Sequence, residues 1–327
     1  MKPAKTAQNW IWRMAKPDVW MIVLTALISG LTSVGMVAFA LISQYVIDIA
    51  TGDQEGHLLV GGIQLIVLVL AEIFLNICYN NLIARMAGRM VMRIEDSTFT
   101  MLFRKNWKDV SAFHTGELVN RLSGDCGVVV SNLVTLVPQV VSMATRLIAC
   151  IAVLFTFDWR FTLILLFVGI LMICIGRLYG QKIKGLHKDC QRADGNNRSF
   201  AQESFANWMV IQSYSGINGI RERFRKLLYR HYRGKLRLAK WRNAGHASSY
   251  LLFSGSYYAA LLWGAVMLAN HSITFGGLTA FLQIAGQVRT PFKNMSGILP
   301  QYYSMLASAE RIMEIENLPD APSAAAV

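Results

Sequence analysis

Residues 161–176 read FTLILLFVGILMICIG and residues 250–269 read YLLFSGSYYAALLWGAVMLA, and both runs are apolar enough for a bilayer. Between them lies a basic segment, residues 177–242, with 16 Lys or Arg against 4 Asp or Glu. Lys and Arg accumulate on the cytoplasmic side of membrane spans. This alternation therefore predicts two membrane helices joined by a long cytoplasmic segment.

The basic segment has the pattern of helices rather than of a loop. It contains no proline, and mostly apolar or small residues recur in it at alternating spacings of three and four, as in packed helix pairs. The two seams are Ile183, Leu186, Cys190, Ala193, Asn197, Phe200 and Ser204, then Ile220, Phe224, Leu227, His231, Gly234, Leu238 and Trp241. We therefore expect two helices that run roughly 40–45 Å into the cytoplasm. A short apolar helix within residues 206–219 should join them at the tip.

Composition places the chain among multi-pass membrane proteins. Its 327 residues are 54% hydrophobic and 16% charged, with a mean hydropathy of +0.38. The net charge of +13 is confined to segments predicted to be cytoplasmic, which argues against a nucleic-acid partner. The five cysteines form no CxxC pattern, so neither a disulfide framework nor a zinc site is expected.

The fold class predicted is an all-α membrane protein with six transmembrane helices and long cytoplasmic extensions. The predicted spans are residues 19–48, 58–83, 128–157, 161–176, 250–269 and 276–307. Residues 84–127 and 177–249 form cytoplasmic arms, because basic residues gather there, whereas the loops on the other side are acidic or carry no net charge. Both termini are then cytoplasmic.

The ends and loops of this domain, residues 19–317, carry their own patterns. Residues 1–18 are basic and rich in Trp, as in an interfacial segment, and residues 318–327 resemble a linker stub. Asp48, Asp53 and Glu55 should form an acidic external loop, and residues 157–160 a short hairpin connection. The first arm has a helical seam of its own, formed by Ile83, Ala87, Met90, Ile94, Ser97 and Met101, and breaks around residues 107–117.

Catalytic signatures are missing from the sequence. It contains no GxxxxGK[ST], HExxH or GxSxG motif, so no catalytic, cofactor-binding or metal-binding residue is expected on this chain. Charged groups within predicted spans are costly and usually face a bundle interior or a water-filled cavity. The candidates for such a cavity are Glu72, Asn76, Arg146, Arg289 and Lys293.

Two interpretations of these intramembrane charges are open. A buried Glu–Arg pair would only hold the helices together, whereas a solvated cavity would bind a substrate. We favour the cavity, because three cations cannot all pair with one anion. A cation-rich cavity would favour anionic or amphipathic cargo.

Short motifs spread along nearly the whole chain resemble one family in order and spacing. They are the TGELxxRLxxD run at residues 115–125, Glu203 with Val210, Ile211 and Tyr214, Gly277 and Leu278 with Phe281, Pro291, and the SAERI run at residues 308–312. Together they resemble the transmembrane domain of an ATP-binding-cassette (ABC) exporter of the six-helix, domain-swapped type. The nucleotide-binding domain of that family is expected on a separate chain or missing here.

The resemblance implies how such a domain works. Its two arms would end in coupling helices that dock on nucleotide-binding domains, which hold ATP and Mg²⁺. The docking residues would be Asp109, Ser111, Phe113, His114, Trp208, Met209, Gln212, Ser213 and Tyr214. Expected partners are a second transmembrane subunit, a nucleotide-binding domain, the bilayer, and a small-molecule, lipid or peptide substrate. The protein would export by alternating access across the cell membrane, as in a bacterial inner membrane.

Two other functions remain as alternatives. A six-helix channel would need a voltage sensor or a filter, yet residues 221–240 are polar on all faces and no filter-like loop precedes the sixth span. Import by an exporter-shaped domain is the other alternative. An importer-type permease loop of the form EAA-x3-G is absent.

Overall fold

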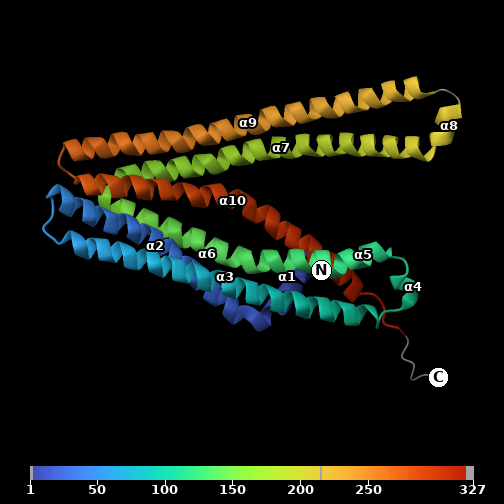
Figure 1. The fold of residues 1–327 in the computed structure, drawn as a ribbon, viewed down its shortest axis with the longest axis horizontal. Helices are drawn as coiled ribbons and strands as arrows, with labels where there is room; N and C mark the ends of the chain where they lie inside the picture. The colour runs from blue at the N-terminus through green and yellow to red at the C-terminus, as the bar shows by residue number, and fades with distance from the viewer. Residues whose placement is uncertain (1–2, 214–215, 322–327) are drawn as a thin grey trace. The chain divides into compact units, whose positions relative to one another are not determined.

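The computed structural model describes residues 3–213 and 216–321, and nearly all of them are helical (Figure 1). The helices are α1 (Pro3–Ala15), α2 (Val19–Thr51), α3 (Leu58–Leu102), α4 (Trp107–Val110), α5 (Thr115–Val119), α6 (Cys126–Phe157), α7 (Trp159–Ala206), α8 (Trp208–Ser213), α9 (Ile217–Ala269) and α10 (Phe275–Glu316). A short 3₁₀ turn, Lys16–Asp18, precedes α2, and a π-helical turn, Asn120–Asp125, precedes α6. The predicted all-α class is confirmed.

Within the described ranges, five continuous helical stretches are long and apolar enough to cross a bilayer. They are Thr6–Thr51, Leu58–Leu102, Thr115–Phe157, Trp159–Ala206 and Ile217–Ala269. Helix α10 is 42 residues long, but Arg289 and Lys293 interrupt its apolar sequence. Its membrane span therefore stays a prediction, whereas the multi-pass character of the chain is established.

The chain forms two compact units, one of which comprises residues 1–162 and 260–327. In this unit α2, α3, α6 and α10 lie alongside one another (Figure 1). Met86 and Met90 of α3 and Val129 of α6 are fully buried in its core. Helix α1 joins the same core through Trp10 and Ile11, so one face of the predicted interfacial segment packs on protein.

The other unit, residues 163–259, is a pair of antiparallel helices, α7 and α9, joined by α8 (Figure 1). The two predicted seams are its buried and half-buried faces, except that Trp241 stays partly exposed against the Tyr179 ring. The rings of Phe200 and Phe224 stack across the pair with centroids 6.0 Å apart. The sequence pattern of this arm is therefore confirmed.

The first arm departs from its predicted seam at one position. Ser97 is exposed, and Thr98 is 3% exposed in its place. Met90, Ile94 and Thr98 follow one another in steps of four, so the buried face of α3 here keeps a constant four-residue step instead of alternating three and four.

Two loop predictions were wrong in detail. Asp48 does not belong to an exposed loop: it is 3% exposed in the last turn of α2 and accepts a hydrogen bond of 2.9 Å from the amide of Gly276. A carboxylate is stable there because the start of α10 carries the positive end of its helix dipole. The predicted four-residue hairpin is a single residue, Asp158, which accepts hydrogen bonds from Trp263 Nε1 and from the amide of Arg160.

Candidate functional site

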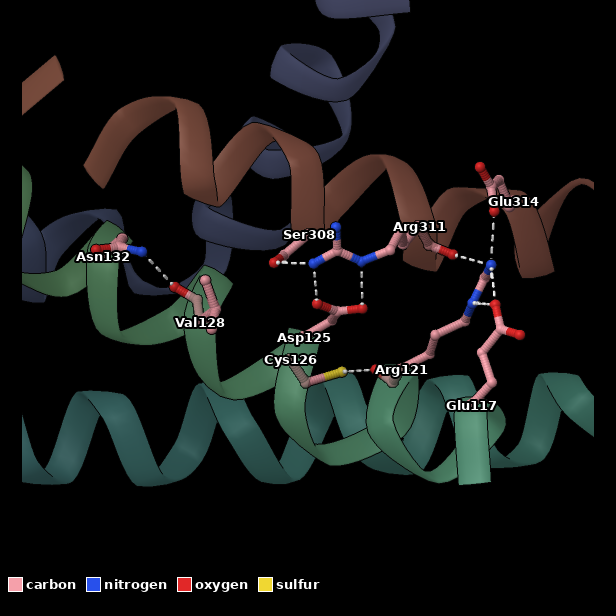
Figure 2. A network of polar contacts seen from close by, with 9 residues as sticks. All are labelled: Glu117, Arg121, Asp125, Cys126, Val128, Asn132, Ser308, Arg311 and Glu314. Atoms are coloured by element: carbon pink, nitrogen blue, oxygen red, sulfur yellow. Dashed lines mark hydrogen bonds and ion pairs between the residues drawn. The ribbon is translucent and has the colours of Figure 1, made fainter. Parts of the chain in front are cut away.

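The clearest cluster of charged groups joins the entry of α6 to the exit of α10 (Figure 2). Arg311 grips the carboxylate of Asp125 with two nitrogens, and the Nε–Oδ2 distance is 2.8 Å. The same guanidinium donates to Ser308 Oγ at 3.0 Å. The side chain of Asp125 is only 4% exposed whereas that of Arg311 is 45% exposed, so this bidentate pair joins a buried carboxylate to a half-exposed guanidinium 186 residues away.

A second arginine completes the cluster. Arg121 contacts Glu117 and Glu314, each at 2.7 Å, and donates to the backbone carbonyl of Arg311 at 2.8 Å (Figure 2). Its guanidinium lies 4.6 Å from the centre of the Phe113 ring, a distance typical of cation–π contact. With 6% of its side chain exposed, Arg121 depends on these partners for its solvation.

Asp125 and Arg311 each stabilise the charged form of the other. Burial works to raise the pKa of Asp125, but hydrogen bonds from Arg311 and Ser308 and the charges of Arg311 and Arg121 hold it below its usual value. The hydrogen bond to Asp125 in turn raises the pKa of Arg311. A lowered carboxyl pKa means that the stabilisation is present at neutral pH and is lost only as the pH falls through the acidic range.

The local fold explains why both buried charges reach α10. Arg121 and Asp125 are four residues apart within the π-helical turn Asn120–Asp125, an uncommon geometry often found at functional sites. The next residue, Cys126, is fully buried, and burial raises the pKa of its thiol to about 12. Cys126 is therefore structural and unreactive at neutral pH.

Two further contacts fasten the exit of α10. Glu316 accepts hydrogen bonds from Trp10 Nε1 and from Arg13 of α1. Just beyond the helix, Lys105 pairs with Asp320 at 2.7 Å, and the flanking backbone pairs as well. The start of the predicted linker stub is thus held beside the segment that leads into α4.

The predicted docking residues of the first arm lie on and after α4. Ser111 and His114 are exposed, whereas Asp109 and Phe113 are half-buried. The sequence interpretation missed Trp107, which is 78% exposed at the start of α4. A large aromatic side chain in water at the end of an arm is typical of an interface anchor.

The second arm ends in the predicted short apolar helix, α8. Trp208 is 61% exposed and Met209 82% exposed, and Gln212 and Ser213 are exposed too. Tyr214, the remaining predicted docking residue, lies outside the described residues. Beneath α8 is an apolar pocket of about 430 Å³, whose lining includes Phe200, Phe205, Trp208, Ile211, Ile220 and Phe224. The tip thus presents apolar side chains outward and an apolar hollow beside them.

The predicted cavity residues lie on three helices. Glu72 is half-buried on α3, and Asn76, one turn along, is exposed and lines two neighbouring pockets. Arg146 is half-buried on α6, with its Nε unpaired among the described residues. Arg289 is exposed on α10, and the side chain of Lys293 lies outside the described ones. The described pockets bring Glu72 and Asn76 together but include neither Arg146 nor Arg289 among their lining residues.

The cluster of Arg121, Asp125 and Arg311 was missing from the predicted site. All three residues stand inside the TGELxxRLxxD and SAERI motifs, which the sequence interpretation used only as marks of resemblance. The spacing of Arg121 and Asp125 predicts that opposite charges share one helix face, but nothing in the two motifs indicates that this face meets Arg311.

A family comparison identifies the chain. Residues 19–292 match the model of the ABC transporter transmembrane region. The chain therefore belongs to this family, and it is a membrane part of an ABC transporter.

Curated relatives agree with this assignment at low identity. The chain is 23% identical to the mitochondrial potassium channel ATP-binding subunit of Pongo abelii over 94% of this chain and 44% of that protein. It is 22% identical to the ATP-dependent lipid A-core flippase of Bordetella avium, covering 82% of this chain and 46% of that protein. The fatty acid ABC transporter ATP-binding/permease protein of Mycobacterium bovis is 22% identical over 63% and 32%. The chain spans less than half the length of these relatives.

Proposed function

We propose that this chain is the transmembrane subunit of an ATP-driven exporter that works by alternating access. Nucleotide-binding domains hold the ATP and Mg²⁺ and supply the energy, and this chain moves the substrate. Two relatives support this function, since one is named an ATP-dependent lipid A-core flippase and the other an ATP-binding/permease protein. The protein acts in the cell membrane, as in a bacterial inner membrane, with both termini cytoplasmic.

The observation that carries the proposal is the exposed apolar end of each arm. Trp107 on α4, and Trp208 and Met209 on α8, stand in water at the far ends of helices whose other halves are suited to a bilayer. Exposed aromatic groups in such places mark docking sites. Each tip therefore receives a nucleotide-binding domain.

The charged cluster can transmit a displacement of α4, caused by the docked nucleotide-binding domain, to α10. A push on α4 reaches α5 and the π-helical turn, and Arg121 and Asp125 pass it to α10 through Glu314 and Arg311. Because these charge-assisted hydrogen bonds are directional and each has one buried partner, the two segments move together. The start of α6 and the end of α10 thus shift as one body when the domain switches.

A second transmembrane subunit completes the transporter. The parts of α7 and α9 in residues 163–259 form a separate unit with exposed apolar residues such as Phe167 and Leu251. In the domain-swapped arrangement this unit packs on the other subunit, so α8 docks on the nucleotide-binding domain of that subunit. The substrate, a small molecule, lipid or peptide, crosses between the two subunits.

The test is coupling in proteoliposomes that contain the chain and its nucleotide-binding partner. Trp208→Ala should weaken docking by about 2 kcal/mol, on the order of 30-fold, and reduce ATP-driven transport accordingly. Loss of an exposed side chain should leave the thermal stability of the membrane domain unchanged.

Tyr232→Ala is the matched control, because Tyr232 is an exposed aromatic residue on the same arm but away from the tip. It should retain transport and ATP hydrolysis. Normal coupling in the Trp208→Ala variant, or transport that continues without the nucleotide-binding partner, would contradict the proposal.

A further inference from the structure

A polar pocket lies where the helices are otherwise apolar. It has a volume of about 330 Å³ and opens between α2, α3 and α6, within their predicted spans. Ser29 and Thr32 line it from α2, Asn76 and Tyr79 from α3, and Gln139 and Ser142 from α6. Pockets of this size with convergent polar groups are typical of ligand sites.

The pocket continues into an apolar surface. Asn76 also lines a second hollow of about 300 Å³ together with Glu72, Ile73 and Ile77. Ile73 and Ile77 are more than half exposed on the outer face of α3. Polar lining groups beside the exposed side chains of Ile73 and Ile77 suit a molecule with a polar head and a hydrocarbon chain.

Glu72 provides the only negative charge among the described lining residues of the two hollows. Its Oε1 atom is buried and has no hydrogen-bond donor within the described part of the chain. Helix α2 leaves room for this carboxylate: a Cβ at Gly35 would come within 2.9 Å of Oε1. A carboxylate whose buried oxygen lacks a donor is costly in its charged form, so a cation held beside the accessible part of Glu72 in the second hollow would stabilise it.

Three hydroxyl groups around the pocket, those of Ser29, Thr32 and Thr135, already donate hydrogen bonds to backbone carbonyls. The Ser29 hydroxyl can donate to the backbone carbonyl of Ala26 or of Pro138, each 2.9 Å away. The Thr32 hydroxyl donates to the backbone carbonyl of Ser29. Thr135, another lining residue, donates to the carbonyl of Ser131 at 2.7 Å. A hydroxyl that has donated still offers its lone pairs. These hydroxyl groups therefore present acceptors, the amides of Asn76 and Gln139 and the phenol of Tyr79 can also donate, and none of the described lining residues is Lys or Arg.

We propose that this site binds an amphiphile with a primary ammonium head, which places its ammonium between Glu72 and the hydroxyl oxygens and its chain along Ile73 and Ile77. An ammonium carries three donors and a positive charge, and so meets both needs of the site. A carboxylate or phosphate head would face Glu72 without a cation. The inference rests on the proposed function in one respect, namely that the bound amphiphile is cargo, and it reverses the anionic preference expected from the sequence.

The test is photolabelling of the full chain in phosphatidylcholine nanodiscs. The probe is dodecylamine that carries a diazirine on its alkyl chain, and the competitors are unlabelled dodecylamine, dodecanol and dodecanoate. Dodecylamine should compete, dodecanol should compete about tenfold or more weakly because it lacks the charge, and dodecanoate should not compete. Labelled peptides should include residues 73–77.

Two variants test the role of the carboxylate. Glu72→Gln should weaken competition by dodecylamine about tenfold or more. Gly35→Ala should weaken it as well, because the new Cβ displaces the end of the Glu72 side chain without removing its charge. Asn81→Leu is the control: Asn81 is exposed on the same helix, lines neither hollow and should bind normally.

Equal competition by dodecanoate and dodecylamine, or unchanged labelling in both Glu72→Gln and Gly35→Ala, would overturn the proposal. If Glu72→Gln is not monodisperse, Gly35→Ala decides alone, since only a flexible side-chain end has to move there. The assay uses neither nucleotide nor partner. Its failure would leave ATP-driven transport standing, and loss of coupling in the Trp208→Ala test would leave amine binding intact.

Discussion

Each ion pair in the cluster around Arg121, Asp125 and Arg311 joins one buried group to one exposed group. Asp125 and Arg121 are buried, whereas Arg311, Glu117 and Glu314 keep about half of their side-chain surface in water. Removing the exposed partner strands a charge in the interior, which is the costly direction. Arg121 forms ion pairs with two carboxylates, Glu117 and Glu314, whereas Asp125 is paired mainly with Arg311.

This asymmetry makes the two exposed partners on α10 unequal. Arg311→Gln should destabilise the domain by about 3 kcal/mol, because Asp125 stays buried and loses its bidentate partner. Glu314→Gln should cost less than about 1 kcal/mol, because Glu117 still pairs with Arg121. Thermal unfolding of the detergent-solubilised chain measures both, and adding Asp125→Asn to Arg311→Gln should recover part of the loss. Equal shifts for the two single variants would show that the cluster is solvated.

Residue chemistry was only partly visible in the sequence. Glu72 and Asn76 were predicted as polar groups in a span, and the structure brings them to one hollow. The contact of Asp125 with Arg311 was not predicted, because a single sequence does not reveal which of many charges pair across 186 residues. Asp48 was misplaced for a related reason, since its partner is a backbone amide that composition does not reveal.

Among the helices, α1 is more firmly fastened than an interfacial segment needs to be. Its buried face reaches α3 and α10, and its Trp10 and Arg13 hold Glu316 at the end of α10. Arg93 of α3 adds a bond of 2.6 Å to Asp18 beyond α1. Helix α1 therefore acts as a clamp that ties the exit of α10 to α3.

Removing the clamp should loosen the last turns of α10. Trp10→Ala removes a buried indole and the hydrogen bond to Glu316, and should cost about 3 kcal/mol. Amide hydrogen exchange in residues 308–316 should then accelerate. Trp12→Ala, on the exposed face of the same helix, should leave exchange there unchanged. Equal protection in both variants would mean that the cluster of Arg121 and Asp125 alone fixes this end.

Helix positions were the part that periodicity predicted well. The seams of α7 and α9 are the faces that are buried, because packed helix pairs impose one repeat over many turns. The pattern failed at Ser97 and Thr98, where the repeat changes to steps of four. The sixth span also stays open, since charge and proline reduce the apolar signal of α10.

For the chain within its membrane, the prediction that matters most is sidedness. Cysteine at position 54, in the exposed loop between α2 and α3, should react with an impermeant thiol reagent added to intact cells. Cysteine at position 213, in α8, should react only after the cells are opened, because the basic arm lies inside. The native cysteines at positions 78, 126, 150, 174 and 190 are replaced first. The reverse labelling pattern would invert the topology.

Family and class followed from the order of motifs, but assembly did not. A chain whose α7 and α9 form a separate unit gives no sign in its sequence of which copy or partner covers them. Composition likewise predicts a membrane protein without saying what it carries. The expectation of anionic or amphipathic cargo came from counting the cations of the predicted cavity, whereas the proposed ammonium site is argued from the surroundings of Glu72.

On the predicted topology, the corner at Asp158 offers very little surface to a probe outside the cell. A single residue, Asp158, connects α6 to α7. Its carboxylate accepts hydrogen bonds from Trp263 Nε1 and from the amide of Arg160. On the predicted topology, an antibody would find almost no epitope there, and an inserted affinity tag would pull the corner apart. Residues 52–57 are all exposed and join α2 to α3, and their backbone makes no hydrogen bond to a distant helix among the described residues. Surface detection of this protein therefore depends on that one acidic loop far more than on the α6–α7 corner.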